Sequence, residues 1–129
     1  MLAIDANVIV RFLTGDEPAQ AAIARALIED QDVFVSATVL LEAEWVLRSG
    51  YGMAKADVIA ALGRLAGLPR LELDDPARIS KALSWAGQGM DFADALHLAA
   101  AEACEAFVTF DRRMAKANVN PSGAPVRLA

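Results

Sequence analysis

Short apolar runs alternate along the chain with longer segments in which apolar residues recur at helical spacing. Residues 2–4, 33–35 and 106–110 are mainly apolar runs of strand length, and residues 2–4 are expected to form a short buried strand. Residues 70–73 alternate between polar and apolar positions and predict a fourth strand, and residues 126–128 are a candidate for a last edge strand. The pattern therefore predicts four or five short strands.

Helical periodicity fills the segments between these strands. The expected helices cover residues 8–13, 18–30, 39–47, 54–66, a segment starting at 76, and 91–101. Their ends carry ordinary signals, such as Asp16 as a cap residue before Pro18 in a first turn, and Gly67 after a last turn. Strands alternating with helices predict an α/β sandwich built around a mainly parallel sheet.

Length and composition indicate one folded domain over residues 1–129. The hydrophobic fraction is 56%, well above that of disordered chains. The first residues lack the pattern of a signal peptide, and no run of about 18 apolar residues without a charge predicts a membrane span. The one cysteine, Cys104, is expected to be a small buried side chain in an alanine-rich helix. A cytoplasmic protein is expected.

The net charge of −5 argues against binding nucleic acid by overall positive charge. Any nucleic-acid contact would have to be local. The basic side chains that could provide it are those of Arg11, Arg48, Arg112, Arg113 and Lys116. The same residues fit an ordinary solvated surface equally well.

Five acidic residues stand at the ends of apolar segments or within them. They are Asp5, Glu42, Asp91, Asp94 and Asp111. Two carboxylates about 4 Å apart repel each other by roughly 4 kcal/mol at an effective dielectric constant of about 20, so a cluster would take up protons or cations. Mg²⁺ or Mn²⁺ is the cation that prefers such oxygen ligands. Because Asp5 and Asp111 each follow a strand, a parallel sheet would bring them to one edge.

Each acid also has a simpler explanation. Asp5, Asp91 and Asp111 all stand where they could cap a helix N-terminus, and capping is the favoured interpretation of Asp91. Glu42 has no capping role in the middle of a helix and is expected to be embedded among apolar residues, with Glu44 as the more exposed alternative.

The aromatic residues and the histidine carry less information. His97, one turn after Asp94, is expected to be packed or solvent-facing rather than a metal ligand. Trp45 and Trp85 are expected to be core or interface residues.

Four segments in order along the chain resemble the motifs of PIN-domain nucleases. They are Ile4-Asp5-Ala6-Asn7-Val8, Ser36-Ala37-Thr38-Val39-Leu40-Leu41-Glu42, Asp91-Phe92-Ala93-Asp94-Ala95-Leu96-His97 and Val108-Thr109-Phe110-Asp111. The resemblance spans nearly the whole chain and is greatest to the small VapC-type toxins of bacteria and archaea. It implies a PIN-like three-layer α/β/α sandwich with a mainly parallel central sheet.

The resemblance also implies a function and a set of site residues. Asp5, Glu42, Asp94 and Asp111 would be the catalytic acids and metal ligands, with Asn7, Thr109 and Asp91 as supporting polar groups. The implied activity is endoribonuclease cleavage of RNA with Mg²⁺ or Mn²⁺. The implied partners are a second copy of the chain and a cognate antitoxin that neutralises the toxin. Arg11, Arg48, Arg112 and Lys116 are then candidates for contact with the RNA backbone.

Two other functions remain open from the sequence. A PIN-like adaptor would use the acids only to shape a binding surface and would have no metal-dependent activity. A haloacid-dehalogenase-like phosphatase would use Asp5 as a nucleophile, but that family expects a second acid where Asn7 stands and a later lysine that has no counterpart here.

Overall fold

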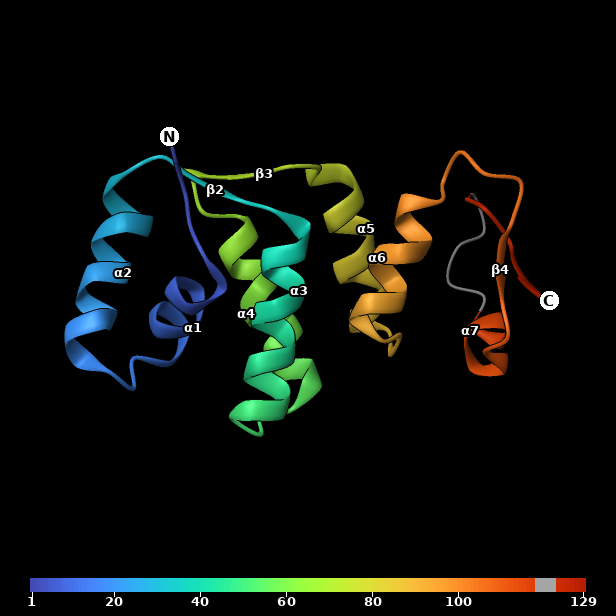
Figure 1. Ribbon diagram of the computed structural model, residues 1–129, viewed down its shortest axis with the longest axis horizontal. Coiled ribbons are helices and arrows are strands. Elements are labelled where there is room, and N and C mark those ends of the chain that lie inside the picture. Colours follow the sequence, from blue (N-terminus) through green and yellow to red (C-terminus); the bar gives the residue numbers. More distant parts are fainter. Residues whose placement is uncertain (118–122) are drawn as a thin grey trace. The chain divides into compact units, whose positions relative to one another are not determined.

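The computed structural model describes residues 1–117 and 123–129. The chain forms two compact units, Met1–Pro76 and Ala77–Ala129. Figure 1 labels the helices and strands of both units in their order along the chain.

The first unit contains a three-stranded parallel sheet. Its strands are β1 (Leu2–Ala3), β2 (Val33–Val35) and β3 (Leu71–Leu73), in the order β1-β2-β3. Ala3 pairs with Phe34, and Phe34 pairs with Glu72. Since all three strands run the same way, their carboxyl ends lie at one edge of the sheet.

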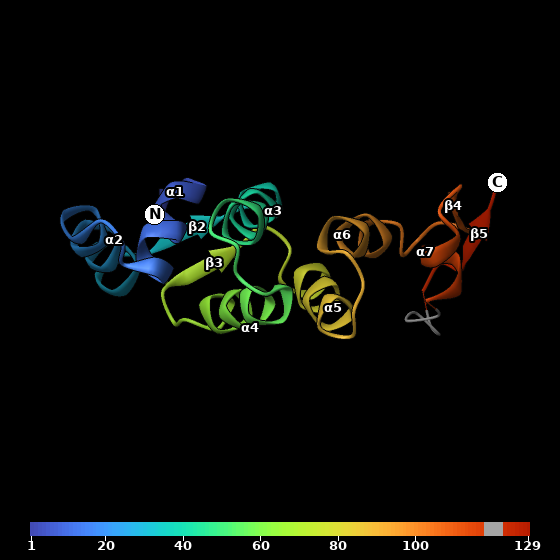
Figure 2. The ribbon, with the colours of Figure 1, turned by 90° about the horizontal axis from the view of Figure 1, so that it is seen from below.

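Helices connect these strands. The connection from β1 to β2 contains α1 (Ala6–Thr14) and α2 (Pro18–Asp30), and that from β2 to β3 contains α3 (Ala37–Trp45), the π-helical turn η1 (Val46–Gly50) and α4 (Lys55–Ala66). Helices α1 and α2 pack side by side (Figures 1 and 2). The sharp turn between them uses Gly15 at a φ of 65°, a left-handed conformation that glycine adopts without strain.

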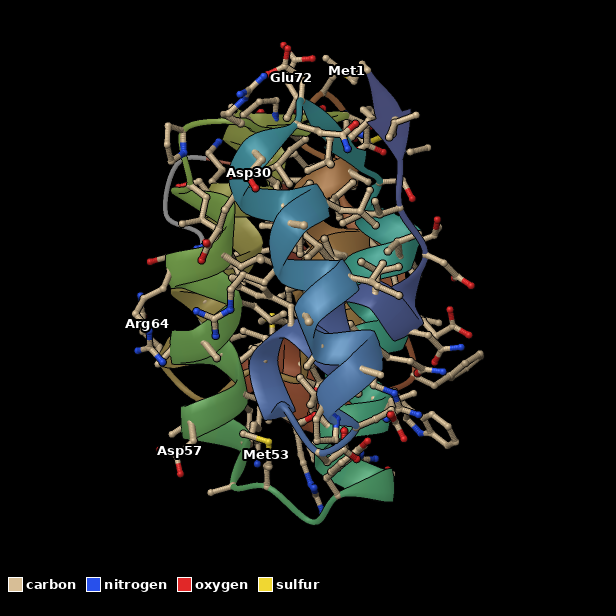
Figure 3. All side chains as sticks on the ribbon, turned by 90° about the vertical axis from the view of Figure 1, so that its left-hand side faces the viewer. Met1, Asp30, Met53, Asp57, Arg64 and Glu72 are labelled. Atoms are coloured by element: carbon tan, nitrogen blue, oxygen red, sulfur yellow. The ribbon has the colours of Figure 1, made fainter. Side chains whose placement is uncertain are left out.

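Apolar side chains from every helix of the first unit form its core. Ile9, Ile28, Leu40, Leu47 and Leu62 are among the fully buried side chains. Figure 3 looks at this unit with Met1 and Glu72 at one end and Met53 and Asp57 at the other. Burial of these apolar groups is the main favourable term in folding.

The second unit combines a helical pair with a small parallel sheet. Its elements are α5 (Pro76–Gly87), α6 (Phe92–Ala100), β4 (Phe107–Thr109), α7 (Arg112–Lys116) and β5 (Val126–Leu128). Strands β4 and β5 are parallel, with Thr109 opposite Leu128. Phe92, Ile79 and Leu98 are fully buried and form the core.

The fold class and most element positions predicted from the sequence are confirmed. Every strand pairing in the described residues is parallel, and the helix at residues 18–30 has the predicted bounds. Residues 126–128 form a strand as expected. None of the helices in residues 1–117 and 123–129 combines the length and apolar character of a membrane span.

Two predictions about burial are wrong. Both residues of β1 are exposed, and of the predicted run 2–4 only Ile4 is buried. Cys104 is exposed and lies outside a helix, because α6 ends at Ala100 and residues 101–105 form turns and bends. The alanine-rich composition around Cys104 did not extend the helix.

Candidate functional site

Asp5 follows β1 at the carboxyl edge of the first sheet and is exposed. One of its carboxylate oxygens, Oδ1, accepts a hydrogen bond of 2.7 Å from the backbone N–H of Ala6, and Asp5 is the N-cap of α1. Asn7 is exposed in the first turn of the same helix. The capping interpretation of Asp5 therefore holds, and Asp5 keeps a solvent-accessible carboxylate at the edge where ligands bind in parallel sheets.

The neighbouring strand ends carry two further polar side chains. Ser36 follows β2, and its Oγ accepts a hydrogen bond of 3.2 Å from the backbone N–H of Val39. Asp74 follows β3, and both of its carboxylate oxygens lie 3.2 Å from the backbone nitrogen of Ala37. Sequence reasoning missed Asp74, although an acid directly after a predicted strand was the signal that had pointed to Asp5. Asp5, Ser36 and Asp74 thus stand at the carboxyl ends of three adjacent strands.

The structure reverses the expected roles of the two glutamates in α3. Glu42 is exposed, whereas Glu44 is 2% exposed. The buried side of α3 carries Leu40, Ala43 and Glu44, so Glu42 falls on the outer side. The prediction that Glu42 is embedded among apolar residues, with Glu44 more exposed, is wrong.

Glu44 is stabilised by an ion pair with Arg48, which lies one helical turn further along the chain. Arg48, in η1, donates hydrogen bonds of 2.8 Å from Nε to Glu44 Oε2 and 3.3 Å from Nη2 to Glu44 Oε1. This side-on pairing satisfies both oxygens of the buried carboxylate. Arg48, a candidate for RNA contact, therefore already compensates a buried charge.

A shallow hollow of about 560 Å³ lies along the outer side of α3. Its lining residues are Thr38, Val39, Leu41, Glu42 and Trp45. Both tryptophans were expected to be core or interface residues. Trp85, at 7% exposed, is a core residue, whereas Trp45, at 59% exposed, is not, and an interface position for Trp45 stays a prediction. The hollow thus joins an accessible carboxylate to an accessible aromatic ring.

Asp91 and Asp94 open α6 in the second unit. Oδ2 of Asp91 accepts a hydrogen bond of 3.1 Å from the backbone N–H of Asp94, which confirms Asp91 as the helix cap. Asp94 is half-buried in the first turn, where a negative charge is favoured by the helix dipole. His97 is exposed, as the solvent-facing interpretation allowed.

Asp111 follows β4 and caps α7. Its Oδ1 accepts hydrogen bonds of 2.9 Å from the backbone N–H of Arg113 and 3.3 Å from that of Met114. The backbone N–H of Asp111 in turn donates to Oγ1 of Thr109 over 3.0 Å. Thr109 therefore fixes the backbone that carries Asp111, and the Asp111 carboxylate is exposed.

The candidate basic residues have different surroundings. Arg112, Arg113 and Lys116 are exposed on α7, directly after Asp111. Arg11 instead belongs to a hydrogen-bonded network on the first unit: it donates from Nε to Gln20 and from Nη1 to Asp16 and Tyr51. The α7 residues are thus better placed for a new partner than Arg11.

The Arg11 network ties the turn between α1 and α2 to the segment after η1. The Tyr51 hydroxyl donates a hydrogen bond of 2.6 Å to Asp16, and the Thr14 hydroxyl donates one of 2.8 Å. These hydrogen bonds, with a lesser contribution from the charge of Arg11, hold the pKa of Asp16 below its ordinary value of 3.8, although desolvation acts in the opposite direction. Sequence reasoning gave Asp16 only a capping role, but Glu17 is the N-cap residue of α2.

The depressed pKa of Asp16 predicts an acid-dependent loss of stability. The contribution of Asp16 is complete above pH 3.8, the pKa expected for the unfolded chain, and is lost as the pH falls through the lower pKa of the folded state. Urea unfolding of the wild type and of Asp16→Asn at pH 7, 4 and 3 should show a steeper acid loss in the wild type. Asp30→Asn, an exposed acid outside the network, is the control and should keep the wild-type slope. Equal slopes in the wild type and Asp16→Asn would contradict this role.

The four proposed metal ligands divide equally between the two units. Asp5 and Glu42 belong to the first, and Asp94 and Asp111 to the second. Among the residues that the structure describes, no group of three or more His, Cys, Asp or Glu side chains is gathered closely enough to hold a metal ion. The donor chemistry fits Mg²⁺ or Mn²⁺, since all four are carboxylates and each is exposed or half-exposed.

Comparison with known families identifies the class of protein. The PIN domain model matches residues 2–120, a range that covers most of both units and includes all four acids. The chain therefore belongs to the PIN domain family, whose members are typically nucleases and generally use divalent metals. No curated protein and no solved structure matches the chain.

Proposed function

We propose that this PIN domain is a Mg²⁺- or Mn²⁺-dependent endoribonuclease and the toxin of a toxin–antitoxin pair. The observation that carries the proposal is the family match over residues 2–120, within which all four acids of the expected motifs are present. Asp5, Glu42, Asp94 and Asp111 are the proposed metal ligands. Asp5, Glu42 and Asp111 are exposed and Asp94 is half-buried.

The residue types suit phosphodiester hydrolysis. A bound divalent ion lowers the pKa of a water molecule and stabilises the negative charge that develops at the phosphate, so no nucleophilic side chain is needed. Asp5, Glu42, Asp94 and Asp111 would hold and orient the ion. Thr109 contributes indirectly, because its hydroxyl fixes the backbone position of Asp111.

The acidic character of the chain is compatible with an RNA substrate. Metal binding neutralises the carboxylates and makes that part of the surface attractive to phosphate. Arg112 and Lys116 are exposed at the first and last positions of α7, the helix that Asp111 caps, and are the proposed contacts to the RNA backbone. Arg11 and Arg48 are proposed to act mainly in the fold, because their guanidinium groups already hold Asp16 and Glu44.

Cleavage of a circular single-stranded RNA tests the nuclease activity. Purified protein with Mg²⁺ or Mn²⁺ should convert the circle to linear fragments, because an endonuclease needs no free end. An exonuclease would leave the circle intact while degrading a linear RNA of the same sequence. Absence of cleavage in both RNAs, across a panel that includes transfer and ribosomal RNA, would contradict the proposal.

The toxin role is a separate part of the proposal, together with a cytoplasmic location, a homodimer and a neutralising antitoxin. Expression of the wild-type chain should arrest bacterial growth, and co-expression of the protein encoded by the neighbouring gene should relieve the arrest. Asp5→Asn is the matched control, since Asn also caps helices but is a much weaker metal ligand. Normal growth with abundant soluble wild-type protein would contradict the toxin role.

A catalytically inactive adaptor remains the alternative, and one observation favours it. Asp5, Asp91 and Asp111 each cap a helix, so these three carboxylates have a structural role without any metal. An adaptor would bind RNA or a protein without cleaving RNA in Mg²⁺ or Mn²⁺. The family match favours a nuclease over the phosphatase considered from the sequence.

A further inference from the structure

We propose that Trp45 is a substrate-binding residue that stacks on an unpaired base of the RNA next to the metal-binding carboxylate of Glu42. The inference rests on the proposed ribonuclease function and specifies its substrate as single-stranded RNA. The sequence pattern assigned Trp45 to the core or to an interface and gave it no role in binding a substrate.

Exposure is the first observation. The Trp45 side chain is 59% exposed, whereas Trp85, the other tryptophan of the chain, is 7% exposed in the core of the second unit. A tryptophan side chain gains more than most from leaving water, because it is large and mainly apolar. An exposed ring of this size is available for a partner.

Position is the second observation. Trp45 stands three residues after Glu42 in α3, and residues at this spacing are neighbours on one helix face. Both line the hollow of about 560 Å³, together with Thr38 one turn before Glu42. The hollow is within the size range of small-ligand sites and can take a nucleobase. A base on the indole ring would therefore lie about one helical turn, roughly 5 Å, from the carboxylate.

The charge of Glu42 favours an RNA base over a second protein copy as the occupant. A protein interface covering Trp45 would also cover the neighbouring carboxylate, and burying an unpaired charge is costly, which is why charges are depleted from interface cores. A nucleotide would avoid this cost, because its base would contact the ring and leave the Glu42 carboxylate free to hold a cation. Stacking on a tryptophan uses the π-face that every base has, so weak base preference is expected.

Kinetics of three variants test the role of Trp45. In Trp45→Ala, kcat/KM for a single-stranded oligoribonucleotide should fall roughly 5- to 100-fold, mainly through a higher KM, in line with the loss of one stacked base. Trp45→Phe should recover most of the loss, because it restores an aromatic face. Ile23→Ala removes another exposed apolar side chain of the same unit and should leave kcat/KM unchanged.

An abasic substrate shows whether the ring contacts a base. Removing the base nearest the cleaved bond should lower kcat/KM of the wild type by about the same factor as Trp45→Ala lowers kcat/KM for the intact RNA. The two changes together should cost little more than either alone, since both remove the same contact. Additive losses at every abasic position would overturn the stacking assignment.

Binding without cleavage separates this inference from the proposed function. In an Asp94→Asn background, the oligoribonucleotide should quench tryptophan emission, and the added Trp45→Phe change should remove most of that quenching. If the wild type cleaves RNA but Trp45→Ala has unchanged KM and quenching, stacking is wrong and the nuclease function stands. If Trp45→Ala instead dissociates a dimer and leaves cleavage unchanged, Trp45 belongs to an interface between copies. If the wild type neither binds nor cleaves RNA, the proposed function itself fails.

Discussion

Asp94→Asn should lower RNA cleavage by at least about 100-fold, because an amide oxygen is a weaker ligand than a carboxylate for a hard divalent cation. Substituting a group that only supports a metal ligand commonly lowers metal affinity or activity by about 10- to 100-fold. Substituting a ligand itself should therefore lower activity by at least the upper end of that range. Stability should fall by less than about 1 kcal/mol, the usual contribution of a first-turn acid to the helix dipole. Steady-state cleavage and urea unfolding of the same preparation measure the two effects.

Asp57→Asn is a closely matched control for Asp94→Asn. Asp57 and Asp94 are both acids in the first turn of a helix, each at the third helical position, of α4 and α6 respectively. Both substitutions therefore remove the same favourable charge at a helix N-terminus. If Asp57→Asn lowered cleavage as much as Asp94→Asn, the loss would be an effect on the fold and Asp94 would not be a metal ligand.

Arg48→Met should destabilise the first unit by roughly 2–4 kcal/mol. Methionine keeps much of the apolar stem of Arg48 but leaves the Glu44 carboxylate, which is buried, without its cationic partner. Breaking a buried ion pair typically costs about 3–5 kcal/mol, and the partial exposure of Arg48 reduces the expected loss. Urea unfolding at pH 7 measures it.

Two companion variants separate the charge effect from other causes. The double variant Glu44→Leu with Arg48→Met removes both charges and should recover much of the lost stability, as apolar replacement of buried pairs often does. Glu42 lies only two residues from Glu44 but is exposed, so Glu42→Gln should change the free energy of unfolding by less than about 0.5 kcal/mol. The same substitution should abolish most RNA cleavage. A stable Arg48→Met protein, or an unstable Glu42→Gln protein, would contradict the assigned roles of the two glutamates.

The sequence predicted the order and type of the secondary-structure elements because strand runs and helix-end signals are local. It also predicted Asp91 as a helix cap, since the spacing of a cap and an acid three residues later reflects the geometry of one helical turn. The acids after β1 and β4 were found because a polar residue directly after an apolar run is visible in the sequence.

The errors come from features that depend on tertiary packing. Residues 39–47 are apolar on nearly all sides, so the helical pattern did not show which side of α3 faces the core, and Glu42 and Glu44 were exchanged. The position of Arg48 four residues after Glu44 was the available signal, because a buried acid needs a cation at that spacing. Asp16 was interpreted as a helix cap from its neighbours alone. Its hydrogen-bond partner Tyr51 is 35 residues away, so no local pattern in the sequence could show that contact.

Cleavage of RNA in metal, in chelator and after metal is restored is the most direct test of the proposed metal-dependent nuclease. We expect fragments with Mg²⁺ or Mn²⁺, none after EDTA, and full recovery when excess divalent metal is added back to the same sample. Cleavage that continues unchanged in EDTA and also persists in Asp94→Asn would contradict the assignment of these carboxylates to a catalytic metal.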